Sequence, residues 1–90
     1  MKWRDISSFS QGDKQRIPHS WECRPNSDLR ITITRGHIHY PGKWVMHCRP
    51  WFECHELEID PADLASAQAA SVELVRQRVA AISAALAAQR

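Results

Sequence analysis

With 90 residues, of which 43% are hydrophobic and 24% charged, the chain fits one small globular domain and is too rich in apolar residues to be disordered. The three cysteines show no CxxC spacing, which argues against a disulfide framework or a paired-cysteine metal site. The most apolar run, 79–88, is about half as long as a membrane-spanning helix requires. Charged residues at the start do not fit a secretory signal, so we expect a cytoplasmic protein with reduced thiols.

Composition changes sharply at Asp60-Pro61. All four tryptophans, all five histidines, all three cysteines and all three glycines precede this point, and an alanine-rich segment follows it. Charge changes as well: residues 1–50 carry nine Lys or Arg and four Asp or Glu, whereas residues 51–90 carry three and six. The first part therefore suits an anionic partner, or the oppositely charged part of a second copy.

Taken in chain order, residues 1–16 predict an irregular or short helical lead-in, because Trp3, Ile6 and Phe9 recur every three residues. Residues 17–59 then alternate between apolar and polar positions, which is typical of strands. The clearest strand is 29–35, and turns are expected at 25–28 and at Pro41-Gly42. We predict a three- or four-stranded antiparallel meander over 17–59.

The last predicted element is a helix over 61–89. Asp60 is expected at its N-cap and Pro61 at its first position, with Asp63 in the first turn, and no Gly or Pro follows. Such a helix would be roughly 40 Å long, about twice the length of the strands. The predicted class is therefore a single α+β domain in which a long C-terminal helix packs on the sheet and extends beyond it.

Two apolar stripes follow this helix, and one of them suggests dimerisation. The first, expected to lie on the sheet, consists of Leu64, Ala67, Ser71 and Leu74. The second has the alternating three- and four-residue spacing of a coiled-coil seam and consists of Val72, Val75, Val79, Ile82 and Leu86. We expect the second stripe to contact a second copy in a homodimer. The alternative is that it also packs on its own sheet.

Metal binding and catalysis are two further readings of the pattern. A zinc-stabilised module could use His37, His39 and one or two cysteines, since His and Cys are the ligands that zinc prefers. The usual spacing between paired cysteines is absent, however, so we predict no metal and no cofactor. No glycine-rich turn presents a nucleophile, so we predict no catalytic residues.

A basic sheet face is a candidate surface for nucleic acid. Alternation places Arg30, Thr32 and Thr34 on the outer face of the central strand, with further basic residues near its ends: Arg24, Arg35, Lys43 and Arg49. The isoelectric point of 8.6 is below that of strongly basic nucleic-acid-binding domains. The strands-then-helix order is similar in layout to the double-stranded RNA-binding domain, but the acidic helix start lacks that family's lysine cluster.

Protein binding is the other candidate function. One alanine-rich helix cannot cover all four tryptophans, and Trp and Arg dominate protein–protein hot spots. Trp51, beside Arg49 and Pro50 in a predicted turn, is the favoured exposed anchor, whereas Trp21 and Trp44 are expected to fill the core. The partner-binding residues predicted on this basis are Trp51, Arg49, Arg30 and Arg35.

The overall layout resembles small accessory proteins encoded by phages and prophages. The residues that carry this resemblance are Trp21, Leu29, Ile31, Ile33, the segment 39–44, Leu57, Ile59, Asp60 and the alanine-rich helix. The resemblance implies a non-enzymatic anti-defence or anti-CRISPR-like inhibitor that occludes a host protein or nucleoprotein complex. Direct nucleic-acid binding by the basic sheet face is the alternative, and the zinc-stabilised module is a second alternative.

Overall fold

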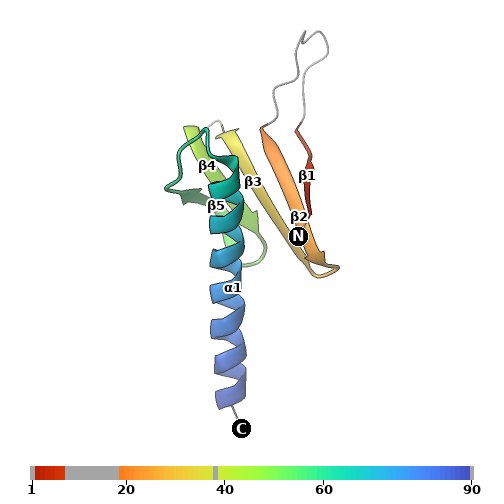
Figure 1. The fold of residues 1–90 in the computed structure, drawn as a ribbon. Coiled ribbons are helices and arrows are strands. Elements are labelled where there is room, and N and C mark those ends of the chain that lie inside the picture. Colours follow the sequence, from red (N-terminus) through yellow and green to blue (C-terminus); the bar gives the residue numbers. More distant parts are fainter. Residues whose placement is uncertain (1, 8–18, 38, 90) are drawn as a thin grey trace.

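The structure, a computed structural model, describes residues 2–7, 19–37 and 39–89. They form a five-stranded antiparallel sheet in the order β1-β2-β3-β4-β5, followed by one long helix, α1 (Figure 1). The elements are β1 Trp3–Asp5, β2 Ser20–Asn26, β3 Leu29–His37, β4 Tyr40–Cys48, β5 Phe52–Leu57 and α1 Leu64–Ala88. The predicted α+β class, an antiparallel meander with a C-terminal helix packed on it, is confirmed.

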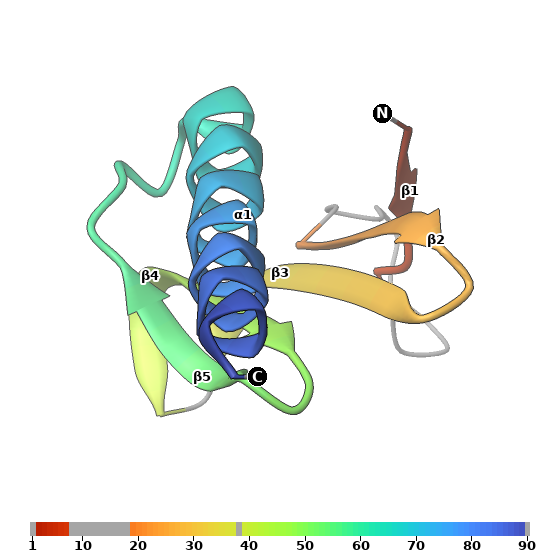
Figure 2. The ribbon, with the colours of Figure 1, turned by 90° about the horizontal axis from the view of Figure 1, so that it is seen from below.

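Helix α1 covers one face of the sheet, which we call the helix face, and packs against β3, β4 and β5 (Figures 1 and 2). Strands β1 and β2 lie away from the helix (Figure 2). The opposite side of the sheet is called the open face. Because side chains alternate along a strand, odd-numbered residues of β3 point to the helix face and even-numbered residues to the open face.

The core lies between the helix face and α1, and its largest fully buried side chain is Trp44. The buried residues of α1 are small (Ala67, Ser71 and Val75), which lets the helix approach the indole closely. The Nε1–H of Trp44 donates to the carbonyl oxygen of Asp60 at 3.0 Å, so the buried ring has its polar atom satisfied. The expectation that Trp44 and the half-buried Trp21 belong to the core is confirmed.

The strand boundaries differ from the prediction in two places. Residues Trp3–Asp5, expected in an irregular or helical lead-in, form β1 and pair with β2, with Arg4 opposite Glu22. The three-residue spacing there was misleading, because pairing with a neighbouring strand decided the local structure; Phe9 and Ile17 lie outside the described residues. The turn expected at Pro41-Gly42 is also wrong. These residues form an irregularity inside β4, where Gly42 adopts a φ of 71°, and the chain reverses between His37 and Tyr40.

The helix begins later than predicted. Its N-cap is Asp63, whose Oδ1 accepts the backbone N–H of Ser66 at 3.0 Å, and its first residue is Leu64. Asp60 forms a turn that precedes the helix, since its Oδ1 accepts from the N–H of Ala62 and its carbonyl accepts from the N–H of Asp63. The carbonyl of Asp60 thus binds Trp44 instead of starting α1.

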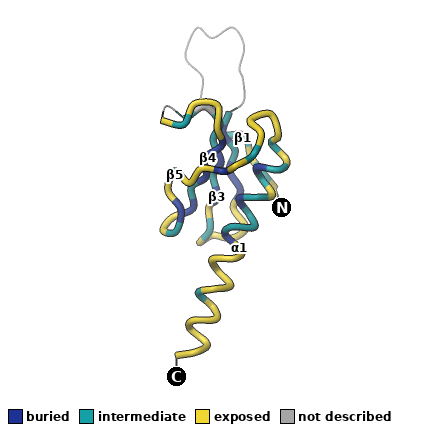
Figure 3. Tube along the Cα trace, turned by 90° about the vertical axis from the view of Figure 1, so that its left-hand side faces the viewer, coloured by how far each residue is buried: buried dark blue, intermediate teal, exposed yellow. Residues whose placement is uncertain are grey.

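The stripe predicted as a dimer seam divides into two parts. Val75 is buried and Val72 half-buried against the protein's own core, as the alternative reading proposed. Farther along, Val79 is 40% exposed and Leu86 is 68% exposed, because α1 extends beyond the sheet (Figure 3). Although α1 has 25 residues, its described sequence is not apolar enough for a helix that crosses a membrane.

We predict that Asp63→Ala lowers the melting temperature by a few degrees, because the first turn of α1 loses the side chain that caps it. Asp63→Asn should retain most of the stability, since asparagine is an equally good N-cap. Thermal denaturation followed by circular dichroism measures both. If the two variants melt together at the wild-type temperature, Asp63 does not cap the helix.

Candidate anion-binding face of the sheet

A single buried carboxylate organises the open face. Glu22 is 3% exposed and forms ion pairs with Arg4, Arg24 and Arg30, which come from β1, β2 and β3. Its Oε1 accepts from the Nε–H of Arg24 at 2.8 Å, and the Oε2 lies 3.5 Å from an Nη of Arg4. The three guanidinium groups are largely exposed, so one negative charge holds three positive charges at the surface.

These contacts stabilise the ionised form of Glu22. The hydrogen bond from Arg24 is the largest influence and, with the positive charge of Arg30, it lowers the pKa of the Glu22 carboxyl despite desolvation, which acts in the opposite direction. The carboxylate is therefore charged at neutral pH and keeps the arginine side chains oriented.

The strand register extends this cluster into two rows. Arg4 is opposite Glu22, Glu22 is opposite Thr32, and Thr32 is opposite His47, so one row crosses four strands. With neighbouring strands about 4.8 Å apart, this row spans roughly 14 Å. Two residues from each member of this row, toward one end of the sheet, lies a second set of basic residues, here called the basic row: Lys2, Arg24, Arg30 and Arg49. Lys2 directly precedes β1 and Arg49 directly follows β4.

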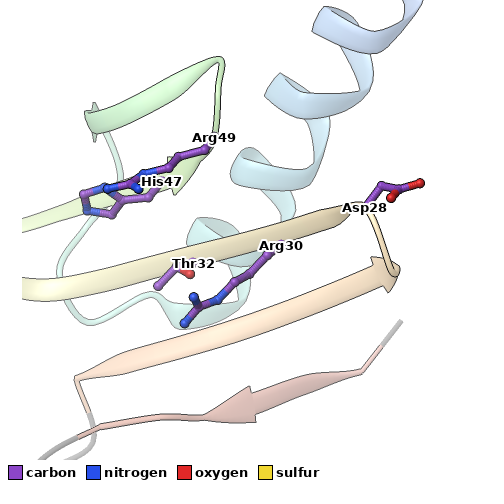
Figure 4. Close-up of a pocket in the computed structure, with 5 residues that line it drawn as sticks. All are labelled: Asp28, Arg30, Thr32, His47 and Arg49. Atoms are coloured by element: carbon purple, nitrogen blue, oxygen red, sulfur yellow. The ribbon is translucent and has the colours of Figure 1, made fainter.

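Two shallow hollows follow the basic row. One, of about 510 Å³, is lined by Asp28, Arg30, Thr32, His47 and Arg49 (Figure 4). The other, of about 310 Å³, is lined by Lys2, Arg4, Glu22 and Arg24. They adjoin, because Arg30 of the first hollow is ion-paired with Glu22 of the second. The carboxylate of Asp28 lies at the β2–β3 turn and points away from His47 in Figure 4.

His47 contributes a neutral imidazole to the first hollow at physiological pH. Burial lowers its pKa, and the nearby His37 and Arg49 lower it further, while Glu53 acts in the opposite direction. Its Nδ1 accepts the backbone N–H of Cys54 at 3.2 Å, so the ring proton belongs on Nε2. The Nε2–H of His47 therefore offers the hollow a hydrogen-bond donor, and the neutral ring adds no positive charge.

The histidines and cysteines that the zinc-stabilised alternative would use are only partly brought together. The Sγ of Cys54 lies 3.8 Å from Nε2 of His37, and the rings of His37 and His39 are 5.7 Å apart. Cys23 and Cys48 are buried on the helix face, where burial raises the pKa of both thiols. Among the described residues, no three His, Cys, Asp or Glu side chains are grouped as metal ligands.

The predicted partner-binding residues lie in three different places. Arg30 and Arg49 line the same hollow on the open face. Arg35 belongs to the helix face instead, where its guanidinium lies 5.3 Å from the Trp44 ring and donates to the carbonyl of Pro61. Arg35 is odd-numbered in β3 and Arg30 is even-numbered, so their side chains point to opposite faces of the sheet. Trp51, expected as an exposed anchor, is half-buried and packs against the core. Its backbone N–H donates to the carbonyl of Cys48 and closes a tight turn.

Lys2, Arg4 and Glu22 were missed from the sequence as members of the site. Lys2 and Arg4 lie in the segment interpreted as a lead-in, and Glu22 was simply one polar residue on the outer side of a strand. To find them, residues 3–5 would have had to be recognised as a strand that pairs with β2, because this pairing places Arg4 opposite Glu22.

We predict that Glu22→Gln destabilises the protein at pH 7, because three arginines lose their shared counter-charge. Since the folded-state pKa of Glu22 is lowered, its stabilisation is present above the unfolded-state pKa and is lost as the pH falls through the folded-state pKa. The gap between variant and wild type should therefore close in acid. Urea denaturation at neutral and acidic pH measures it. Glu56→Gln, which removes the more exposed partner of Lys43, is the control and should have little effect at either pH.

No protein-family model matches this chain, and neither curated proteins nor solved structures give a significant match.

Proposed function

We propose that this protein is a non-enzymatic binding module whose open face binds the phosphate backbone of a nucleic acid. The observation that carries the proposal is the basic row, in which Lys2, Arg24, Arg30 and Arg49 line two adjoining hollows on the open face. Backbone phosphates are recognised by such side chains in series, and each neutralised phosphate releases counterions.

The basic row is available to a ligand. Arg49 is exposed and, within the described residues, lies in no ion pair with a carboxylate, while Arg24 and Arg30 share Glu22 with Arg4. The face therefore carries excess positive charge around its buried carboxylate. Thr32 and the neutral His47 add uncharged polar groups of the kind that also contact phosphate and sugar.

The open face is less suited to a typical protein partner. Protein–protein hot spots require large apolar or aromatic side chains in a desolvated centre. Among the described residues, the exposed large hydrophobic side chains are Val79 and Leu86, and both belong to α1, on the other side of the sheet. A face that offers charge and hydroxyl groups without an apolar anchor favours a phosphate backbone.

The proposal predicts binding that weakens steeply with salt. Titration of a labelled single-stranded oligonucleotide, with its duplex in parallel, should give a linear fall of log affinity against log salt concentration. Arg49→Gln and Lys2→Gln should each weaken binding several-fold and reduce this slope by about one phosphate contact. Glu22→Gln should strengthen binding, because it removes negative charge from the face.

Lys43→Gln is the matched control. Lys43 is also basic and on the sheet, but it is paired with Glu56 at 2.6 Å and lies outside the basic row. It should leave the affinity near that of the wild type. Equal losses in Lys43→Gln and Arg49→Gln, or binding that is insensitive to salt, would contradict the assignment of the basic row.

A protein partner is the second candidate, and one observation favours it: half-buried Trp51 lies beside exposed Arg49 in the β4–β5 turn. On this alternative the module would be a phage-encoded inhibitor of a host nucleic-acid-handling or defence complex. Capture from bacterial lysate with and without nuclease distinguishes the two candidates. A protein that is retained after nuclease treatment and lost with Arg49→Gln would favour the inhibitor, whereas nuclease-sensitive capture would favour the nucleic acid.

A further inference from the structure

The end of α1 that extends beyond the sheet is apolar and uncharged. Residues 79–89 contain no charged side chain, and the face that packs on the sheet at Val75 continues as the distal stripe, defined as Val79, Ile82 and Leu86. Val79 and Leu86 are 40% and 68% exposed (Figure 3). The stripe therefore has an apolar side that its own sheet is too short to cover.

An apolar groove lies at the base of this stripe. It has a volume of about 490 Å³, comparable with pockets that take a small ligand, and it lies between the β2–β3 hairpin and α1. The sheet side is formed by Pro25, Leu29 and Ile31. The helix side is formed by Val72, Val75, Arg76, Val79, Ala80 and Ser83. Since α1 packs on β3 to β5, the hairpin side of the groove is left uncovered by its own helix (Figure 2).

We propose that a second copy of this chain occupies the groove, in an antiparallel, two-fold symmetric dimer that exchanges the ends of α1. The spacing of the apolar residues fits this arrangement. Val75, Val79, Ile82 and Leu86 are separated by four, three and four residues, a pattern that reads the same in both directions. Antiparallel helices therefore place Val79 of each copy against Ile82 of the other, and Leu86 against Val75 at the groove.

Charge supports the same orientation. The last turn of α1 has no basic side chain among the described residues, and a cation is stabilising at the negative end of a helix dipole. Antiparallel pairing places this end beside Arg76 of the other copy, which lines the groove. In a parallel dimer the two negative ends would lie together, and both grooves would stay empty.

Small residues permit the close contact that the arrangement needs. Ala80 and Ser83 lie on the groove side of the helix, and side chains of this size allow helix axes to approach to about 8 Å. The overlap from Val75 to Ala88 is about 20 Å long, and it joins the groove in one continuous apolar strip. The contact uses the helix side of the molecule and leaves the basic row exposed, so it does not depend on the proposed function.

The oligomeric state tests the dimer. By sedimentation equilibrium the wild type should be a dimer, and Leu86→Glu should raise the dissociation constant by at least about 100-fold, because two carboxylates would enter an apolar contact. Leu86 is largely exposed in the single chain, so this variant should keep its circular dichroism spectrum. Ala81→Glu, at an exposed position of α1 that faces β5 rather than the groove, is the control and should change the constant by less than about threefold.

Spin labels test the orientation. With Gln89→Cys labelled in a Cys54→Ser background, antiparallel helices place the two labelled positions about 25 Å apart along the axis. Parallel helices would place them about 8–10 Å apart. A monomeric wild type, a Leu86→Glu variant that dimerises as the wild type does, or the short label distance would each overturn the proposal.

Discussion

The hydrogen bond from the buried Trp44 indole to the carbonyl of Asp60 is the contact on which this structure depends. It joins the central part of the sheet to the turn that leads into α1. Because the ring is fully buried, the donor would be costly to leave unsatisfied, so the chain after β5 has to pass over the indole before the helix can begin. Arg35 lies over the same ring and donates to the carbonyl of Pro61, which holds the turn from a second position. The start and direction of α1 follow from these contacts.

The way α1 is fixed determines the character of both sheet faces. With the helix on β3 to β5, no described helix or strand packs on the open face, and the side chains exposed there include those of Arg4, Arg24 and Arg30. Glu22 shows how far this goes: its carboxylate is buried by the side chains of the arginines that pair with it. A charge that is desolvated in this way needs its partners. The need to satisfy one carboxylate therefore keeps several guanidinium groups at the surface.

The sequence was a better guide to the strands and the helix than to which residues lie opposite each other on neighbouring strands. Alternation in 29–35 is a local property, and it correctly separated Arg30 and Thr32 from the core residues; the alanine-rich helix was equally clear. The register between strands is not local, so the sequence did not reveal that Lys2 and Arg49, far apart in the chain, line adjoining hollows on the same face of the sheet. Trp51 was misjudged for a different reason, since a tight turn folds it back on the core. Arg35 could have been placed correctly, because its parity in β3 already assigned it to the helix face.

The length of α1 relates the part of the helix that covers the sheet to the part that would form the dimer contact. A helix that only covered the sheet could end near Val75, the last residue of α1 that is buried. The chain instead continues for thirteen further helical residues, from Arg76 to Ala88, and the stretch after Arg78 has no charge and little to gain from water. Alanine stabilises the helical conformation, but this alone does not explain why the helix extends beyond the sheet. Pairing of two chains through the apolar groove beside the base of the same helix would explain the extension. Each copy then covers the uncovered part of the other, while both open faces stay exposed.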